Sequence, residues 1–161
     1  MRNFLKALTI SLFLFLPFSC GNEEEVNVLP EVPVNLKINL LVDDELRTPG
    51  NYKEYIKGVH KPLAGEYLGY GGILVLRSIH TGEEIPFRAF DLSCPYEKSP
   101  TIRVKASREK GVTATCQECG RIYNLLEDGR ITSESSKLHL QRYNVKPSSD
   151  PNIFRITRDF Y

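Results

Sequence analysis

Two short stretches decide how this sequence folds: residues 90–96 read FDLSCPY, and residues 116–124 read CQECGRIYN. Each contains a cysteine that follows a run rich in β-forming residues, residues 87–91 before the first stretch and residues 112–115 before the second. Because β-branched and aromatic residues favour strands, we expect each cysteine to lie in a loop at the end of a strand. The sequence therefore predicts two cysteine-bearing loops carried by a β framework.

Further strand-like segments flank the two loops. Apolar and polar residues alternate over residues 34–40, which is the period-two pattern of a half-buried strand. Turn signals such as Thr81-Gly82 and Asp128-Gly129 separate the later segments, and no long amphipathic helix interrupts them. This spacing is typical of a β-sandwich or barrel. The other expected strands are residues 73–76, 85–90, 102–105, 112–115, 122–125, 138–145 and 153–157.

Composition excludes some classes of function. The chain of 161 residues carries 21 Lys and Arg against 20 Asp and Glu, so no strong positive field favours nucleic acid as a partner. The sequence shows no Ser/His/Asp set, no paired acids and no phosphate-binding loop. We therefore expect at most an electron-transfer protein and not a stand-alone enzyme.

The N-terminus has the features of an export signal. Arg2 and Lys6 precede a nearly continuous apolar run over residues 7–18, which is shorter than the about 20 residues that cross a bilayer. The run ends at residues 16–21, LPFSCG, where a small residue precedes Cys20 and glycine follows it, as in a loose lipobox. We predict a lipoprotein signal peptide over residues 1–19 and lipidation of Cys20. An ordinary signal peptide with an incidental cysteine and a buried apolar helix are the alternatives.

Residues 20–33 are predicted to be the lipidated cysteine and an acidic linker, and residues 34–161 the β domain. Residues 23–25 are all glutamate, and Pro30 and Pro33 discourage regular structure. Such an anchor implies a membrane partner and a place in the cell envelope, attached to the outer membrane on its periplasmic or its surface face. The acidic triplet resembles surface-export signals of some Gram-negative lipoproteins, or it is a solvated tether.

The two cysteine loops resemble the cluster-binding loops of Rieske [2Fe–2S] domains. That family reads Cys-x-His in the first loop and Cys-x-x-His-Gly in the second, followed by an aromatic residue, Asp or Asn, and a later glycine. The likeness extends over residues 69–157. It implies an all-β, Rieske-like antiparallel sandwich or barrel with a small cluster-binding-type subdomain formed by two loops. It also implies one-electron transfer to a redox or envelope partner that the sequence does not identify.

Both histidine positions of the family differ in this chain. By position, Cys94 and Cys116 match the thiolates that hold one iron, whereas Tyr96 and Cys119 stand where two histidines would hold the other. A thiolate and a phenolate add negative charge, which should lower the potential below the about −150 to +300 mV of Rieske centres. The three histidines lie elsewhere and are expected at the surface, namely His60, His80 and His139. Tyr123 is expected to be a core aromatic residue.

Three states of the site stay open. The first is a [2Fe–2S] cluster held by Cys94, Tyr96, Cys116 and Cys119. The second is Zn²⁺ on the three thiolates, with Tyr96 or water as fourth ligand. The third is a metal-free domain with two of these cysteines in a disulfide, reused for binding. Residues 1–3 contain no twin-arginine signal, so we expect secretion of an unfolded chain, which could not carry a preassembled cluster.

Overall fold

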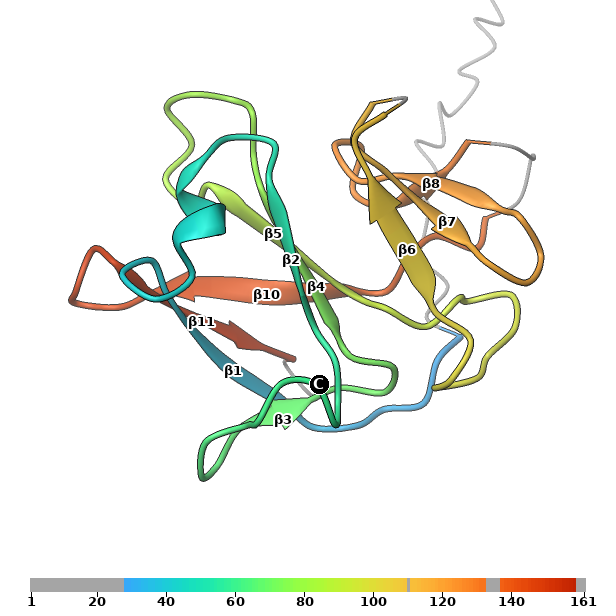
Figure 1. The fold of residues 1–161 in the computed structure, drawn as a ribbon, viewed down its shortest axis with the longest axis horizontal. Helices are drawn as coiled ribbons and strands as arrows, with labels where there is room; N and C mark the ends of the chain where they lie inside the picture. Colours follow the sequence, from blue (N-terminus) through green and yellow to red (C-terminus); the bar gives the residue numbers. More distant parts are fainter. Residues whose placement is uncertain (1–27, 110, 133–136, 159–161) are drawn as a thin grey trace, which may run out of the picture.

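The computed structural model describes residues 28–109, 111–132 and 137–158 (Figure 1). The expected all-β class is confirmed, because the only helical element in these ranges is a short 3-10 helix, η1 (Asp44–Arg47). No helix in these ranges has the length and apolar character needed to cross a membrane. The predicted signal peptide and Cys20 lie outside the described residues. The strands are β1 (Val34–Asn39), β2 (Tyr52–Tyr55), β3 (Tyr67–Leu68), β4 (Ile73–Arg77), β5 (Phe87–Asp91), β6 (Val104–Ser107), β7 (Thr113–Cys116), β8 (Ile122–Asn124), β9 (Arg130–Ile131), β10 (Arg142–Pro147) and β11 (Ile153–Thr157).

The strands form two antiparallel sheets of different size. The larger sheet has the order β2-β4-β5-β10-β11-β1-β3, and the smaller one has the order β6-β7-β8-β9. Figure 1 shows the smaller sheet, in yellow and orange, as a separate lobe beside the larger one. The loop after β5 passes from the larger sheet into β6 of the smaller sheet, and the second cysteine loop connects β7 to β8. The first predicted loop therefore connects the larger sheet to the smaller one, and the second lies within the smaller sheet.

Two apolar clusters fill the interior, and β4 is buried in both. This strand reads ILVLR, and its first four residues are fully buried. Ile73 and Val75 belong to the cluster inside the larger sheet, whereas Leu74 and Leu76 belong to the cluster that also contains the smaller sheet. A strand covered on both faces needs a continuous apolar run and not an alternating one. The second cluster includes Cys94, which places one predicted site residue in the core.

The buried carboxylate of Asp91 connects the end of β5 to its surroundings. It accepts hydrogen bonds from the backbone amides of Tyr70 at 2.9 Å, Gly71 at 3.1 Å and Ser93 at 2.7 Å, and from the hydroxyl of Tyr143. Burial, and then the charge of Asp91, raise the pKa of Tyr143, so its hydroxyl stays protonated and can donate. A buried carboxylate is tolerated only with such partners. Asp91 thus fixes the chain three residues before Cys94.

The predicted strands and the observed ones differ most before β10. Residues 138–145 were expected to form one strand, but β10 begins at Arg142. The amide of Leu140 donates to the carbonyl of Gly129 at 3.0 Å, and Nδ1 of His139 accepts from the amide of Ile131 at 3.3 Å. These residues therefore contact the β8–β9 region before the chain enters the larger sheet. The short strands β2, β3 and β9 were not predicted.

Asp91→Ala should destabilise the fold by about 2–4 kcal/mol, because three backbone amides, two of them buried, lose their acceptor. Tyr143→Phe removes only one donor to the same carboxylate, so it should cost about 1–2 kcal/mol. Urea unfolding followed by far-ultraviolet circular dichroism measures both free energies. Equal losses for the two variants would show that the carboxylate is not the centre of this network.

Candidate metal centre

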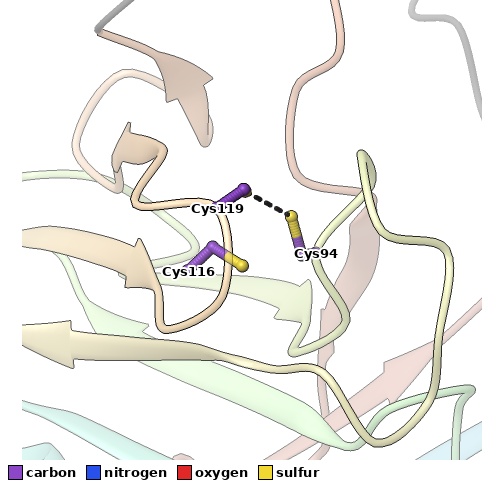
Figure 2. A group of neighbouring side chains, drawn as sticks. All are labelled: Cys94, Cys116 and Cys119. Carbon is purple, nitrogen blue, oxygen red and sulfur yellow. Dashed lines mark hydrogen bonds between the residues drawn. The ribbon is translucent and has the colours of Figure 1, made fainter.

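The thiols of Cys94, Cys116 and Cys119 converge, as the sequence analysis predicted for a shared site. Their sulfur atoms all lie within 4.8 Å of one another (Figure 2). Cys94 follows β5, Cys116 is the last residue of β7, and Cys119 lies in the turn before β8. Cys94 and Cys116 are buried, whereas Cys119 is partly exposed. The site therefore has a closed side in the core and an open side at Cys119.

Backbone hydrogen bonds close the first loop at its base. The amide of Val104 donates to the carbonyl of Leu92 at 2.8 Å, and the amide of Cys94 donates to the carbonyl of Ile102 at 3.1 Å. Within the loop, the amide of Lys98 donates a hydrogen bond to the carbonyl of Cys94 at 3.0 Å. Residues 94–102 consequently form a pinned loop, and the position of the Cys94 thiol is set by the strands on both sides.

The second loop is a tight turn that brings Cys119 back toward Cys94. The amide of Gly120 donates to the carbonyl of Cys116 at 3.1 Å, and the amide of Cys116 donates to the carbonyl of Arg121 at 2.9 Å. Gly120 has a φ of +69°, the left-handed conformation that glycine adopts without steric cost. Glycine at position 120 therefore allows this tight turn. The resulting Cys94 to Cys119 sulfur separation is 3.7 Å.

Tyr123 adds a polar contact that the sequence analysis did not identify. It is fully buried, as expected for a core aromatic residue, but its hydroxyl also lies 3.5 Å from the sulfur of Cys94. Burial, and then the neighbouring Cys94, raise the pKa of Tyr123, so the hydroxyl stays protonated and can donate to a thiolate. The available signal was the tyrosine four residues after Cys119 in the second stretch.

Arg121 contacts both residues that stand at the family's histidine positions. Its guanidinium lies 3.4 Å from the ring centroid of Tyr96, which is half exposed. Burial acts to raise the pKa of Cys119, but hydrogen bonds from the amide and guanidinium of Arg121, together with those from Cys116 and Cys94, outweigh burial and lower it. Among the described residues, the Tyr96 hydroxyl makes no hydrogen bond to a cysteine thiol. The structure thus brings together the three cysteines and places Tyr96 at the outer edge.

The histidines take no part in this centre. In the part of the chain that the structure describes, the three cysteines are the only group of potential metal ligands that converge. His80 is exposed as expected. His60 and His139 are half-buried, which corrects the expectation that they lie at the surface. Each has a local packing or hydrogen-bonding role, because His60 packs edge-on against Tyr55 and His139 accepts a backbone hydrogen bond.

The sulfur geometry fits one tetrahedral metal ion. Metal–sulfur bonds of about 2.3 Å hold two thiolates about 3.8 Å apart on such an ion, and Cys94 and Cys119 are 3.7 Å apart. The cluster arrangement expected from the sequence would instead place Cys94 and Cys119 on different irons.

The fold and this geometry define an all-β protein with a three-thiolate candidate metal centre. No family model matches the chain, and no curated protein sequence matches it. Among solved structures, it is similar to a Mycobacterium tuberculosis protein described as an NADH-dependent nitrite reductase small subunit, at 10% identity and a TM-score of 0.42. That alignment covers 81% of this chain and 100% of the other. At this similarity, conclusions about function follow from the chain's own residues.

Without metal, Cys119 should react with iodoacetamide several-fold faster than Cys94 or Cys116. It is the most exposed of the three thiols and has a lowered pKa, whereas burial raises the pKa of Cys116 to about 12. Timed alkylation at pH 7 with peptide mass spectrometry measures the order. Arg121→Gln should slow labelling of Cys119 selectively. Faster labelling of Cys116 would contradict the assigned electrostatics.

Proposed function

We propose that this chain is an envelope lipoprotein whose Rieske-like domain binds a single thiophilic metal ion through Cys94, Cys116 and Cys119. The observation that carries the proposal is the 3.7 Å separation of the Cys94 and Cys119 sulfurs. Thiolates favour zinc, copper(I) and iron among the common metals. In the tetrahedral zinc form, Tyr96 or water supplies the fourth ligand.

Such an ion would act as a structural link between the two loops. Cys94 belongs to the connection that leaves the larger sheet, whereas Cys116 and Cys119 belong to the smaller sheet. Metal binding requires deprotonated thiols, and burial raises the pKa of Cys116 to about 12, so binding must release its proton. The gain is a cross-link at the boundary between the sheets.

A [2Fe–2S] electron-transfer centre is the second candidate. One observation favours it: Tyr96 and Cys119 both adjoin Arg121, so the two family histidine positions lie side by side. Cys94 and Cys116 would hold one iron, and Cys119 and Tyr96 the other. The cluster would supply one-electron chemistry at a lower potential than in Rieske centres. Without an imidazole N–H, proton-coupled oxidation of a quinol is not expected.

Protein purified without air should contain about one zinc per chain and show no visible charge-transfer bands. Cys94→Ser, Cys116→Ser and Cys119→Ser should each lose the metal, because each removes one of three ligands. Tyr96→Phe should retain it, since water can take the fourth position. Elemental analysis with an absorption spectrum provides the measurement, and circular dichroism verifies that each variant folds.

Two other results would change the conclusion. Two irons per chain with visible bands, lost in Tyr96→Phe, would establish the cluster and reject the single ion. A metal-free protein with two of the three cysteines in a disulfide would reject both candidates and leave a binding domain.

The proposed anchor rests on the N-terminal sequence. Residues 1–19 would be removed as a signal peptide, Cys20 would carry the lipid, and residues 20–33 would tether the domain of residues 34–161 to the outer membrane. Acyl chains add roughly 0.8 kcal/mol per buried CH₂, so several chains on one cysteine hold firmly. The periplasmic and surface faces both remain compatible with this anchor.

Cells expressing the full chain should incorporate radioactive palmitate into it, and Cys20→Ala should abolish the label. The substitution removes the only proposed acylation site, so the unprocessed precursor should also accumulate. Cys119→Ala is the matched control and should keep the label, because it changes a cysteine of the folded domain. Label retained in Cys20→Ala would disprove the anchor.

A further inference from the structure

An exposed loop between β2 and β3 presents large apolar side chains to solvent. Val59 is 79% exposed, Leu63 63% and Tyr67, at the start of β3, 55%. The loop makes two consecutive turns: the amide of Val59 donates to the carbonyl of Ile56 at 3.1 Å, and the amide of Glu66 donates to that of Leu63 at 3.0 Å. Figure 1 shows this loop at the lower edge of the molecule, beside β3.

Fixed contacts beneath the loop hold these side chains outward. The carboxylate of Glu66 accepts hydrogen bonds from the backbone amides of Leu63 at 2.8 Å and Lys37 at 3.2 Å. His60 packs edge-on against Tyr55 with ring centroids 5.0 Å apart, and its Nε2 lies 3.8 Å from Glu66. Val59 and Leu63 are therefore exposed on a loop whose backbone is held in place by hydrogen bonds and packing. Several exposed apolar side chains on one short loop are typical of a contact surface.

The chain that leads to the proposed anchor joins the domain at the same place. A groove of about 370 Å³ lies beside the loop, and its apolar lining includes Val32 and Pro33 of the linker, Pro62, and Tyr67 and Leu68 of β3. The linker continues directly into β1, whose Val34 pairs with Leu68. Val32 lies twelve positions after Cys20, a span of about 40 Å at full extension. A lipid on Cys20 would keep this surface close to the bilayer.

Charge distinguishes this surface from another exposed apolar site on the larger sheet. Leu41 and Val42 are 64% and 73% exposed at the far end of β1, but acidic residues 43–45 follow them. The β2–β3 loop instead carries exposed Lys57 and Lys61 on either side of Val59. Lysines beside apolar side chains suit a surface of anionic lipid headgroups.

We infer that Val59, Leu63 and Tyr67 rest on the lipid bilayer, with Lys57 and Lys61 toward anionic headgroups. The inference rests on the proposed Cys20 anchor, because the tether supplies a high local concentration of membrane and a weak contact then suffices. With this contact, the lipoprotein domain would have a fixed orientation on the membrane, whereas the tether alone would let it rotate freely.

The absence of tryptophan from the chain allows a direct test. The full lipidated protein carrying Leu63→Trp is reconstituted into vesicles of phosphatidylethanolamine and phosphatidylglycerol. Its emission should shift to shorter wavelength and be quenched several-fold by brominated lipids. Val42→Trp, a substitution of similar exposure at the other end of β1, should stay unquenched. Adding Lys57→Glu and Lys61→Glu to Leu63→Trp should reduce the quenching.

Vesicle flotation separates the two proposals. If Leu63→Trp floats with the vesicles and stays unquenched, the anchor stands and the docking inference is overturned. If the protein does not float, the anchor fails and the inference fails with it. If a chain that lacks residues 1–20 and carries Leu63→Trp shows, without vesicles, a blue shift that grows with protein concentration, the surface binds a second copy and the lipid inference is wrong.

Discussion

The buried carboxylate of Asp91 is the interaction on which the cysteine centre depends. It accepts hydrogen bonds from the amide of Gly71, before β4, and from the amide of Ser93, after β5. This one carboxylate therefore fixes the chain on both sides of the entrance to the first loop. Arg103 completes the frame, because its Nε donates to the carbonyl of Gly71 at 2.5 Å and its backbone pairs with Ser93. A side chain at residue 71 would collide with Ser93, since an added Cβ would lie 2.1 Å from its hydroxyl oxygen. Cys94 follows this rigid frame directly.

The three thiols differ in burial and in the polar and charged groups beside them. On the core side, burial raises the pKa of Cys116, and Tyr123 offers a hydroxyl to Cys94. On the outer side, Arg121 lowers the pKa of Cys119. A metal ion would therefore complete its coordination from the side of Cys119, where water or another ligand has access. An electron partner of a cluster would approach from that same side.

Local patterns carried most of what could be predicted. The two loops were predicted from cysteines placed next to β-rich runs, and the prediction that the loops converge rested on the resemblance of the two stretches to the Rieske cluster loops. Strands β3 and β9 span only two residues each, which is too short for a periodic signal. Residues 138–141 alternate apolar and polar side chains as a strand would. Hydrogen bonds of His139 and Leu140 to the β8–β9 region instead keep this segment out of β10. The sequence offered no competing signal there.

Apart from the convergence of the three cysteines, side-chain contacts between distant segments could not be predicted. Arg121 meets Tyr96 across 25 positions of sequence, and nothing in either stretch pairs these residue types. The contact of Tyr123 with Cys94 is similar, because the pattern indicates an aromatic core residue but does not show where its hydroxyl points. These side chains set the electrostatics of the centre, so its preference for one ion or a cluster follows from tertiary contacts.

The arrangement of the sheets explains why a metal at this position would matter mechanically. The backbone of Ala106 in β6 bonds to the side chains of Tyr52 and Glu54 in β2, which holds one end of the smaller sheet against the larger one. The three thiols lie where β7 ends and the loop from β5 arrives, so an ion there would secure a second point of contact. The proposed membrane contact uses the β3 edge of the larger sheet. Metal binding and membrane docking are therefore carried by separate elements, and each can be altered without changing residues of the other.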